Sequence, residues 1–328
     1  MYEKFYHFSG IPFLLTPDSR FFFGSSGHSR AIAHLVYGLA QEEGFIVITG
    51  EVGAGKTTLV EQLWSQLDRH TYFIARIVTT QVSADDLLRL VMDNFGIGDT
   101  PGLDKATLLR RFEFMVQEQR RAGRRCLLVV DEVQNLPLAA LEELRMLSNI
   151  TVDGHASIQT ILLGQPQFRP ILASRDAEQL RQRVLASYHL GPLTEAETRS
   201  YIDHRLKMVR WEGDPRWDDD AYSMVYRHTG GIPRRINTLC SRVLLYGSLE
   251  EAHAITAPMV EVTAGELNQD LGAGLAPAPS PPSQVNGGAG EHGAVLRRIE
   301  ALEASAARQD RVFRRMLDLF GTIREPPQ

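Results

Sequence analysis

The chain has 328 residues, of which 43% are hydrophobic and 23% charged, enough to bury the core of one large domain with an appendage. The formal net charge of −5 gives no general attraction to nucleic acid or anionic lipid, so nucleic acid is not expected as a partner. Two cysteines in apolar runs predict buried, reduced thiols. The sequence offers no membrane span, and its first residues lack the apolar region of a signal peptide, which favours a cytoplasmic protein.

Residues 1–44 carry scattered aromatic side chains interrupted by glycine and proline, which predicts an irregular hook that packs onto a core. From Ser29 to Gln41 the apolar residues recur at helical spacing, so a helix is expected there. The aromatic residues can fill the core, which is the simpler interpretation for any one of them. Alternatively, the hook could supply a flat apolar slot for an adenine base.

A glycine-rich segment follows the apolar run Phe45 to Ile48 and leads into a helical pattern. Eight residues match the pattern G-x-x-x-x-G-K-[ST] completely, and Thr58 follows them: Gly50, Glu51, Val52, Gly53, Ala54, Gly55, Lys56 and Thr57. Glycines let the loop wrap closely round phosphate oxygens, and the helix N-terminus directs its positive end at them. We expect Lys56 to contact the β- and γ-phosphates of ATP and the Thr57 hydroxyl to bind Mg²⁺.

The next stretch predicts a strand at 72–77, a helix capped by Ser83 that ends at Gly96, and a long amphipathic helix at about 105–122. The long helix ends in a basic run. Its arginines are explained by the negative end of the helix dipole, whereas a phosphate-binding patch is the less favoured interpretation. They are Arg120, Arg121, Arg124 and Arg125.

An acidic pair, Asp131 and Glu132, follows the continuous apolar run from Cys126 to Val130. Such a run is typical of a strand buried in a parallel sheet, and the carboxyl end of that strand is where such sheets bind ligands. Asp131 is expected to hold Mg²⁺ through its water shell, and Glu132 to polarise the water that attacks the γ-phosphate.

A strand at 158–163 precedes Gln165, the candidate for a side chain that hydrogen-bonds the γ-phosphate or the attacking water. We expect this strand to lie between the phosphate-loop strand and the Asp131 strand. Further on, Arg181 and Arg183 lie just before a short strand at 187–190. An arginine at this position of ring-forming NTPases enters the site of the neighbouring subunit, although an arginine at a helix end also commonly caps the helix.

From Thr194 to about Gln269 the pattern is helical throughout, beginning with a capping box and a helix through Trp211. A second helix covers 218–229, and Pro233 starts the next, with Arg234 in its first turn and able to reach the γ-phosphate. Residues 271–290 have the composition of a flexible linker. A heptad pattern at 291–324 is short for a lone helix and implies a partner, either another copy or a groove on another protein.

Together these motifs resemble one family, the AAA+ ATPases of the ExeA type from general secretion pathways. The resemblance is strongest to the secretion ATPases at exosortase (PEP-CTERM) exopolysaccharide loci. It covers about residues 1–268 and rests on short motifs: Pro12-Phe13, Thr16-Pro17-Asp18, Tyr37-Gly38, Gly50 to Thr58, Asp131 to Leu136, Gly164-Gln165-Pro166, Gln182-Arg183, Tyr188-His189-Leu190 and Gly231 to Arg234.

The resemblance implies an α/β P-loop NTPase with a five-stranded parallel sheet and a helical lid. It implies Gln165 as sensor 1, Arg183 rather than Arg181 as the arginine finger, and Arg234 as sensor 2. The expected parts are the hook at 1–44, a nucleotide-binding core at 45–191, the lid at 192–270, the linker at 271–290 and the heptad helix at 291–324. ExeA-type proteins continue through a membrane span into a peptidoglycan-binding domain, and this C-terminus departs from that pattern.

We therefore expect a Mg²⁺-dependent ATPase, a homo-oligomer that drives conformational change in a secretion or exopolysaccharide-export assembly. The heptad helix is expected to bind the protein partner, which could also hold the chain at the inner membrane. One alternative is a DNA-dependent AAA+ regulator of the kind that assists transposition, which a basic face would favour. The other is a nucleotide-gated oligomeric scaffold that barely hydrolyses ATP.

Overall fold

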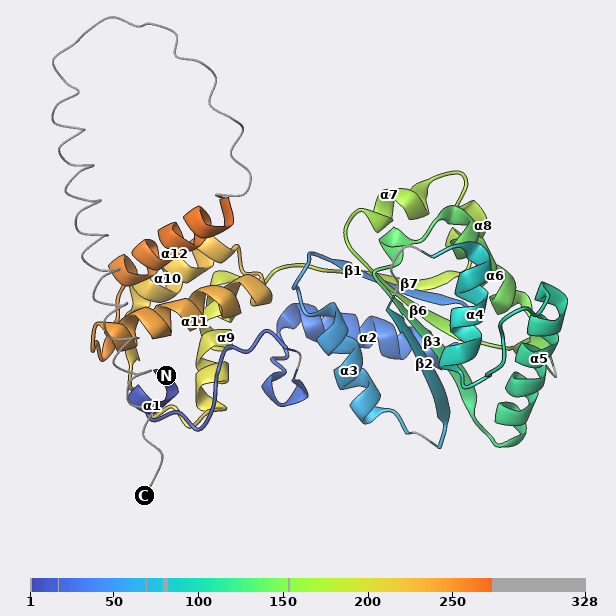
Figure 1. The fold of residues 1–328 in the computed structure, drawn as a ribbon, viewed down its shortest axis with the longest axis horizontal. Coiled ribbons are helices and arrows are strands. Elements are labelled where there is room, and N and C mark those ends of the chain that lie inside the picture. Colours follow the sequence, from blue (N-terminus) through green and yellow to red (C-terminus); the bar gives the residue numbers. More distant parts are fainter. Residues whose placement is uncertain (1, 17, 69, 79–81, 153, 273–328) are drawn as a thin grey trace, which may run out of the picture. The chain divides into compact units, whose positions relative to one another are not determined.

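The computed structural model describes residues 2–16, 18–68, 70–78, 82–152 and 154–272 (Figure 1). The heptad helix expected at 291–324, and the linker beyond Gly272, lie outside the described residues. One compact unit comprises residues 1–248 and 252–265, and it contains every element that positions the site below.

Five parallel strands form the central sheet, in the order β2-β3-β6-β1-β7. The three central strands, β3, β6 and β1, are buried on both faces, which explains why they read as continuous rather than alternating hydrophobic segments. The expected position of the strand before Gln165, between the other two ligand-bearing strands, is confirmed. The strands are β1 (Phe45–Gly50), β2 (Tyr72–Val78), β3 (Arg125–Asp131), β6 (Gln159–Gly164) and β7 (Val184–Leu190).

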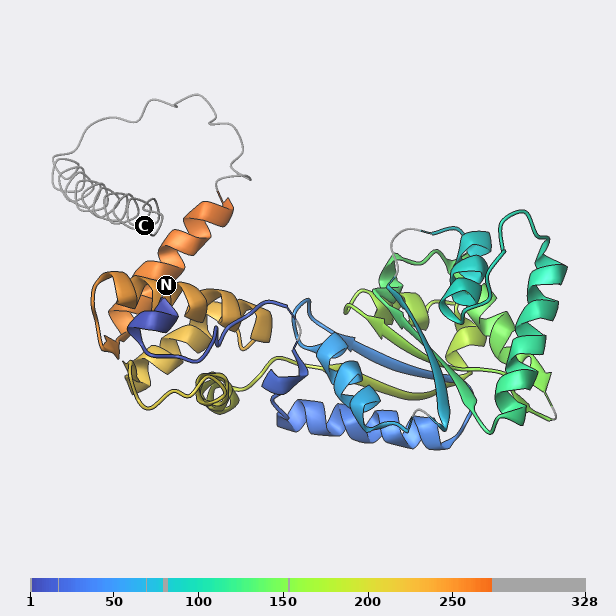
Figure 2. The same cartoon turned by 60° about the horizontal axis from the view of Figure 1, so that its bottom comes forward.

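Helices cover both faces of the sheet, so alternate residues of each strand belong to different cores. In Figure 2 the blue helices α2 (Ser26–Ala40) and α3 (Lys56–Gln66) lie on one face. The other face carries α4 (Ala84–Asn94), α5 (Lys105–Arg121) and α6 (Leu138–Asn149). Helix α2 begins earlier than predicted, because the Ser25 side chain accepts a hydrogen bond from the His28 amide and caps it there.

Shorter elements connect these parts. Two of them, β4 and β5, pair as a small hairpin that the sequence pattern did not indicate. The shorter elements are α1 (Tyr2–Phe5), η1 (Ser19–Phe21), η2 (Val133–Asn135), β4 (Thr151–Val152), β5 (His155–Ala156), α7 (Phe168–Ala173) and α8 (Glu178–Arg181).

The C-terminal helical part has its own core, which includes aromatic residues of the N-terminal hook such as Tyr6 and Phe13. The prediction of helix throughout this part was wrong, since two short strands pair in parallel within it, and its first helix ends at Lys207 rather than Trp211. The capping box at Thr194 is confirmed. The elements are α9 (Glu195–Lys207), β8 (Arg216–Trp217), α10 (Asp219–Thr229), α11 (Pro233–Leu249), β9 (Ala254–Ile255) and α12 (Ala257–Gly272).

Two glycines of α2 provide a matched test of how closely this helix packs on β1. A Cβ on Gly38 would lie 2.5 Å from Cγ1 of the fully buried Ile46, whereas one on Gly27 would meet no atom closer than 3.5 Å. We expect Gly38→Ala to lower the free energy of unfolding by about 1–3 kcal/mol through overpacking. Gly27→Ala should leave it unchanged or raise it, because alanine favours helix. Urea unfolding of both variants measures the difference, and equal stabilities would contradict the packing argument.

Candidate nucleotide site

The glycine-rich loop leaves β1 at its carboxyl end and ends at Gly55, the N-cap of α3. Gly53 and Gly55 have φ angles of 82° and 96°, the left-handed region that glycine adopts without strain. The Gly53 carbonyl accepts a hydrogen bond of 3.2 Å from the Arg234 amide, and a Cβ on Gly53 would lie 2.3 Å from Cβ of Arg234. The loop thus combines a strand end, a helix N-terminus and close contact with α11.

Lys56 is buried at the first residue of α3. Its Nζ donates to the carbonyl oxygens of Gly50, at 2.8 Å, and Glu51, at 3.1 Å. Burial lowers the pKa of Lys56, and the carboxylates of Glu132, Asp131 and Glu51 offset this shift only in part. The ammonium group is therefore held inside the curve of the loop, where it can exchange carbonyl partners for phosphate oxygens.

The side chains of Thr57 and Asp131 meet directly, with Thr57 Oγ1 donating to Asp131 Oδ2 at 3.0 Å. Asp131 is buried at the end of β3, and its Oδ1 accepts from the Glu132 amide at 2.9 Å. A hydroxyl beside a carboxylate suits Mg²⁺, which binds proteins through one or two such oxygens together with substrate phosphates and water. Arg76 on β2 also donates to Asp131 Oδ2, at 3.2 Å, a contact that the sequence pattern did not indicate.

Glu132 lies next to this pair in a left-handed conformation, with φ of 53°, which is strained for a residue with a side chain. Its Oε2 accepts hydrogen bonds from Gln134 and, at 3.0 Å, from Gln165. Burial raises the pKa of Glu132, but these two hydrogen bonds and the charge of Lys56 together outweigh burial and hold the pKa below its ordinary value. The backbone amide of Gln165 also donates to Gln134 Oε1, at 2.8 Å, which fixes the position of Gln165.

The three predicted arginines lie in different places. Arg234 is exposed in the first turn of α11 and lines the cavity described below. Arg183 precedes β7 at the start of the sheet, about 20 Å of strand away from the loop edge, so it does not join the site of its own chain. Its Nη1 lies 3.4 Å from the Ser148 carbonyl at the end of α6. Arg181 instead donates to carbonyls at the end of α7, the nearest at 3.0 Å, as a capping cation does.

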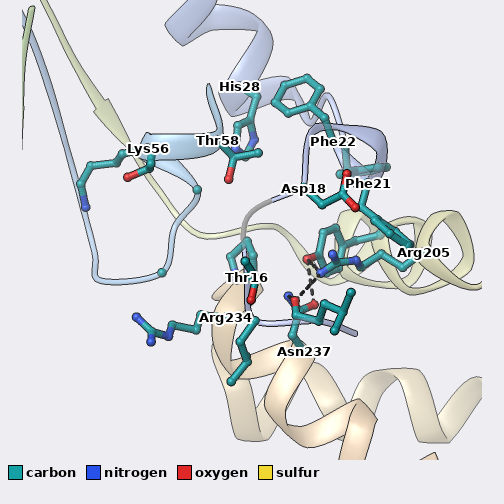
Figure 3. A pocket seen from close by; sticks show the side chains of 18 of the residues that line it. Thr16, Asp18, Phe21, Phe22, His28, Lys56, Thr58, Arg205, Arg234 and Asn237 are labelled. Carbon is teal, nitrogen blue, oxygen red and sulfur yellow. Dashed lines mark hydrogen bonds between the residues drawn. The ribbon is translucent and has the colours of Figure 1, made fainter. Parts of the chain in front are cut away.

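A cavity of about 320 Å³ extends from the phosphate loop to the hook (Figure 3). One end has Lys56, Thr57 and Glu132 in its lining, and the other is largely aromatic. In Figure 3 the Arg205 side chain extends from α9 towards Asn237, on the side of the cavity away from Lys56. The residues of this second end, which we call the base end, are Leu14, Phe21, Phe22, Phe23, His28, Tyr201, Arg205 and Asn237.

Apart from the aromatic residues of the hook, none of these residues was predicted to line the site, and three of them, His28, Arg205 and Asn237, carry polar groups into it. The sequence carried a signal for Arg205, because it shares the buried face of α9 with Tyr201 and Ile202 at helical spacing. An arginine on an apolar face requires a partner or a function. His28 carried no such signal, since its position beside the loop depends on how α2 packs.

The geometry is that of a P-loop nucleotide site, and comparison with known proteins agrees. Residues 39–172 match the family model of the AAA domain. The described residues also resemble Cdc6p from Pyrobaculum aerophilum, with a TM-score of 0.62 and 18% identity over 76% of this chain and 71% of that one. ORC2 of Aeropyrum pernix, solved in ADPNP-ADP complexes, gives 0.56 and 16% over 73% and 66%. The chain therefore has the α/β AAA fold.

Sequence similarity points to a more particular relative. Over 268 residues the chain is 34% identical to general secretion pathway protein A of Aeromonas hydrophila. That match covers 82% of this chain and 49% of the relative, so the chain spans about half the length of that protein. No helix in the described part of the chain is both long and apolar enough to cross a membrane.

His28 makes the stability of this site dependent on pH. Burial lowers the pKa of its imidazole from 6.5 to about 4, opposed only by the charge of Glu197. The unfolded state therefore takes up the proton first, and stability is lost as pH falls from about 6.5 to about 4, by up to about 3 kcal/mol. In His28→Gln this part of the loss should disappear.

Urea unfolding at pH 7 and pH 5 measures the effect. The control His70→Gln changes an exposed histidine and should retain the wild-type pH dependence. If His28→Gln loses as much stability as the wild type between these pH values, the burial argument is wrong.

Proposed function

We propose that this chain binds ATP with Mg²⁺ and hydrolyses it to ADP and phosphate within a homo-oligomer. The observation that carries the proposal is the 3.0 Å hydrogen bond between Thr57 and Asp131, which joins the loop to the acidic strand end beside Lys56. These three groups are the expected ligands of a Mg²⁺-triphosphate: a cation for the phosphates and two oxygens for the metal. The AAA fold and the similarity to general secretion pathway protein A support the proposal.

In this mechanism Lys56 would leave its two carbonyl partners to bind the β- and γ-phosphates, and Thr57 and Asp131 would hold Mg²⁺. Bound Mg²⁺ neutralises charge on the phosphates. The Glu132 carboxylate, kept ionised by its lowered pKa, orients and polarises a water towards the γ-phosphate. Arg234 lines the cavity and supplies a further positive charge there.

In this proposal Gln165 senses the γ-phosphate. Its Nε2 donates to Glu132 in the structure, so the same amide can turn towards the γ-phosphate when a triphosphate is present. Release of Glu132 from Gln165 would then accompany triphosphate binding. This exchange of partners couples the presence of the γ-phosphate to the position of the water-polarising carboxylate.

Replacement of the proposed water-polarising group provides the main test. Glu132→Gln keeps the shape of the side chain but removes the carboxylate, so kcat should fall by about 10²–10⁴-fold while Mg²⁺-ATP affinity is retained. Phosphate release and calorimetry measure the two quantities. The control Glu118→Gln changes an exposed carboxylate on α5 and should hydrolyse ATP at the wild-type rate. Wild-type turnover in Glu132→Gln would exclude this role of Glu132.

We propose further that Arg183 acts as an arginine finger on the site of a neighbouring copy. Its place at the start of the sheet, remote from its own loop, supports action in trans, and Arg181 is already occupied at the end of α7. Such an arginine offsets negative charge on the phosphoryl group as it is transferred. In sites of this kind the arginine raises kcat by about 10³-fold or more.

Arg183→Ala should therefore bind ATP normally and lose about 10³-fold in turnover, whereas the matched control Arg181→Ala should keep it. Mixing Arg183→Ala with Lys56→Ala subunits should restore part of the activity. The Arg183→Ala subunit keeps an intact phosphate loop, and the neighbouring Lys56→Ala subunit supplies Arg183 to it. Turnover of the mixture against either variant alone is the measurement. An absence of any recovery would argue that Arg183 does not act between subunits.

The biological setting that we propose is a secretion or exopolysaccharide-export assembly, such as those at exosortase loci. Support comes from the identity to general secretion pathway protein A. The heptad segment at 291–324 would bind the partner protein, and that partner would determine whether the chain works in the cytoplasm or at the inner membrane.

A further inference from the structure

The base end of the cavity contains a buried arginine without a counter-ion among the described residues. Arg205, on α9, is only 5% exposed. The carboxylate that interacts with it weakly, Asp18, is already paired with Arg20 through hydrogen bonds as short as 2.7 Å. A guanidinium removed from water without a carboxylate is unfavourable unless other groups, including a ligand, accept its hydrogen bonds.

The contacts that Arg205 does make position it but leave donors free. Its Nη1 donates to the Tyr201 hydroxyl at 3.0 Å and to the Leu14 carbonyl at 3.5 Å. Its Cζ lies 4.8 Å from the centre of the Phe21 ring and 5.5 Å from that of Tyr201, within the range of cation–π attraction. Its Nε has no acceptor in the part of the chain that the structure describes, although it is buried.

Polarity along the cavity indicates which part of a ligand meets Arg205. The loop and Lys56 serve the phosphates at the opposite end. Around Arg205 the lining is aromatic, with the Phe21 and Tyr201 rings next to its guanidinium. His28, which lies between the Phe22 ring and Gly55, remains uncharged at neutral pH because burial lowers its pKa to about 4. Flat apolar walls with few polar groups suit a planar heterocycle rather than a second anion.

The polar groups here form a donor beside an acceptor. Arg205 supplies only donors, and the Leu14 carbonyl, which accepts long hydrogen bonds of 3.5 Å from Arg205 and 3.3 Å from Asn237, is an acceptor. Adenine presents the complementary pair, a ring nitrogen that accepts and an exocyclic amino group that donates. Guanine carries an acceptor at the exocyclic position, so that contact would be mismatched at either edge of the base, and at N1 guanine also carries a donor, so there both contacts would be mismatched.

We propose that Arg205 is the residue that reads the base, by donating to a ring nitrogen of adenine while the Leu14 carbonyl accepts from its amino group. This inference rests on the proposed binding of ATP and adds its specificity determinant. Tyr201 is a positioning residue in this arrangement, since its hydroxyl accepts from Arg205 and donates to Asn237 Oδ1 at 2.8 Å.

Analogues of ATP that lack one ring nitrogen test the proposal. Calorimetry with Mg²⁺ compares ATP, its 1-deaza, 3-deaza and 7-deaza analogues, GTP and inorganic tripolyphosphate, each against the full chain and Arg205→Met. In the wild type, either the 1-deaza or the 7-deaza analogue should bind about tenfold or more weakly than ATP, as expected for a lost hydrogen bond to a charged group, whereas the 3-deaza analogue, whose missing nitrogen is remote from the amino group, should bind like ATP. In Arg205→Met that difference should vanish and the preference for ATP over GTP should shrink to what the Leu14 carbonyl supplies, while tripolyphosphate binding is unchanged.

The matched control Arg199→Met removes a charge from the same helix at a side chain that pairs with Asp219, and should keep all the wild-type ratios. Tyr201→Phe serves if Arg205→Met does not fold, and should reduce the difference between ATP and the same analogue. Equal ratios in wild type and variants, or equal loss for every ligand including tripolyphosphate, would overturn the role of Arg205. Failure of the wild type to bind any triphosphate would instead refute the proposed function itself.

Discussion

The order of three parallel strands, β3-β6-β1, is the constraint on which the site depends. Parallel strands end at the same edge of a sheet, and neighbours lie about 4.8 Å apart. Groups far apart in the chain therefore meet: Lys56 after β1, Gln165 after β6, and Asp131 with Glu132 at the end of β3. An order in which β3 and β6 were not neighbours would separate Gln165 from Glu132, whose side chains are hydrogen-bonded at 3.0 Å.

Much of this edge could be predicted from the sequence, because its signals are local. A strand buried on both faces reads as a continuous apolar run, and the phosphate loop is encoded by consecutive residues from Gly50 to Thr58. The parts that could not be predicted lack such signals. Strands of two residues, such as β8 and β9, are too short to show a period. The packing of Tyr6 and Phe13 into the core of the helical part depends on contacts between distant segments.

The two ends of the cavity differ in the same way: local sequence predicts the phosphate end but not the base end. At the phosphate end, backbone groups and one lysine follow from the loop conformation, which glycines permit. At the base end, Leu14 comes from the hook, His28 from α2, Arg205 from α9 and Asn237 from α11. The hook also supplies Phe21, Phe22 and Phe23, but the polar groups come from four separate segments, so no single stretch of sequence contains the pattern. Only the burial of a charged residue on the apolar face of α9 indicated that something there requires explanation.

Helix α11 joins the two ends. Its first turn is bonded to the loop, where the Arg234 amide donates to the Gly53 carbonyl, and a side chain on Gly53 would collide with Arg234. Three residues on, Asn237 shares a face with Arg234 and bonds Tyr201 and the Leu14 carbonyl. Because a helix rises only 1.5 Å per residue and is stiff over one turn, this turn of α11 holds the loop and the Leu14 and Tyr201 side of the cavity in a fixed relation. A ligand that fills both ends thus acts on one rigid element, which makes α11 the part of the lid best placed to report an occupied site.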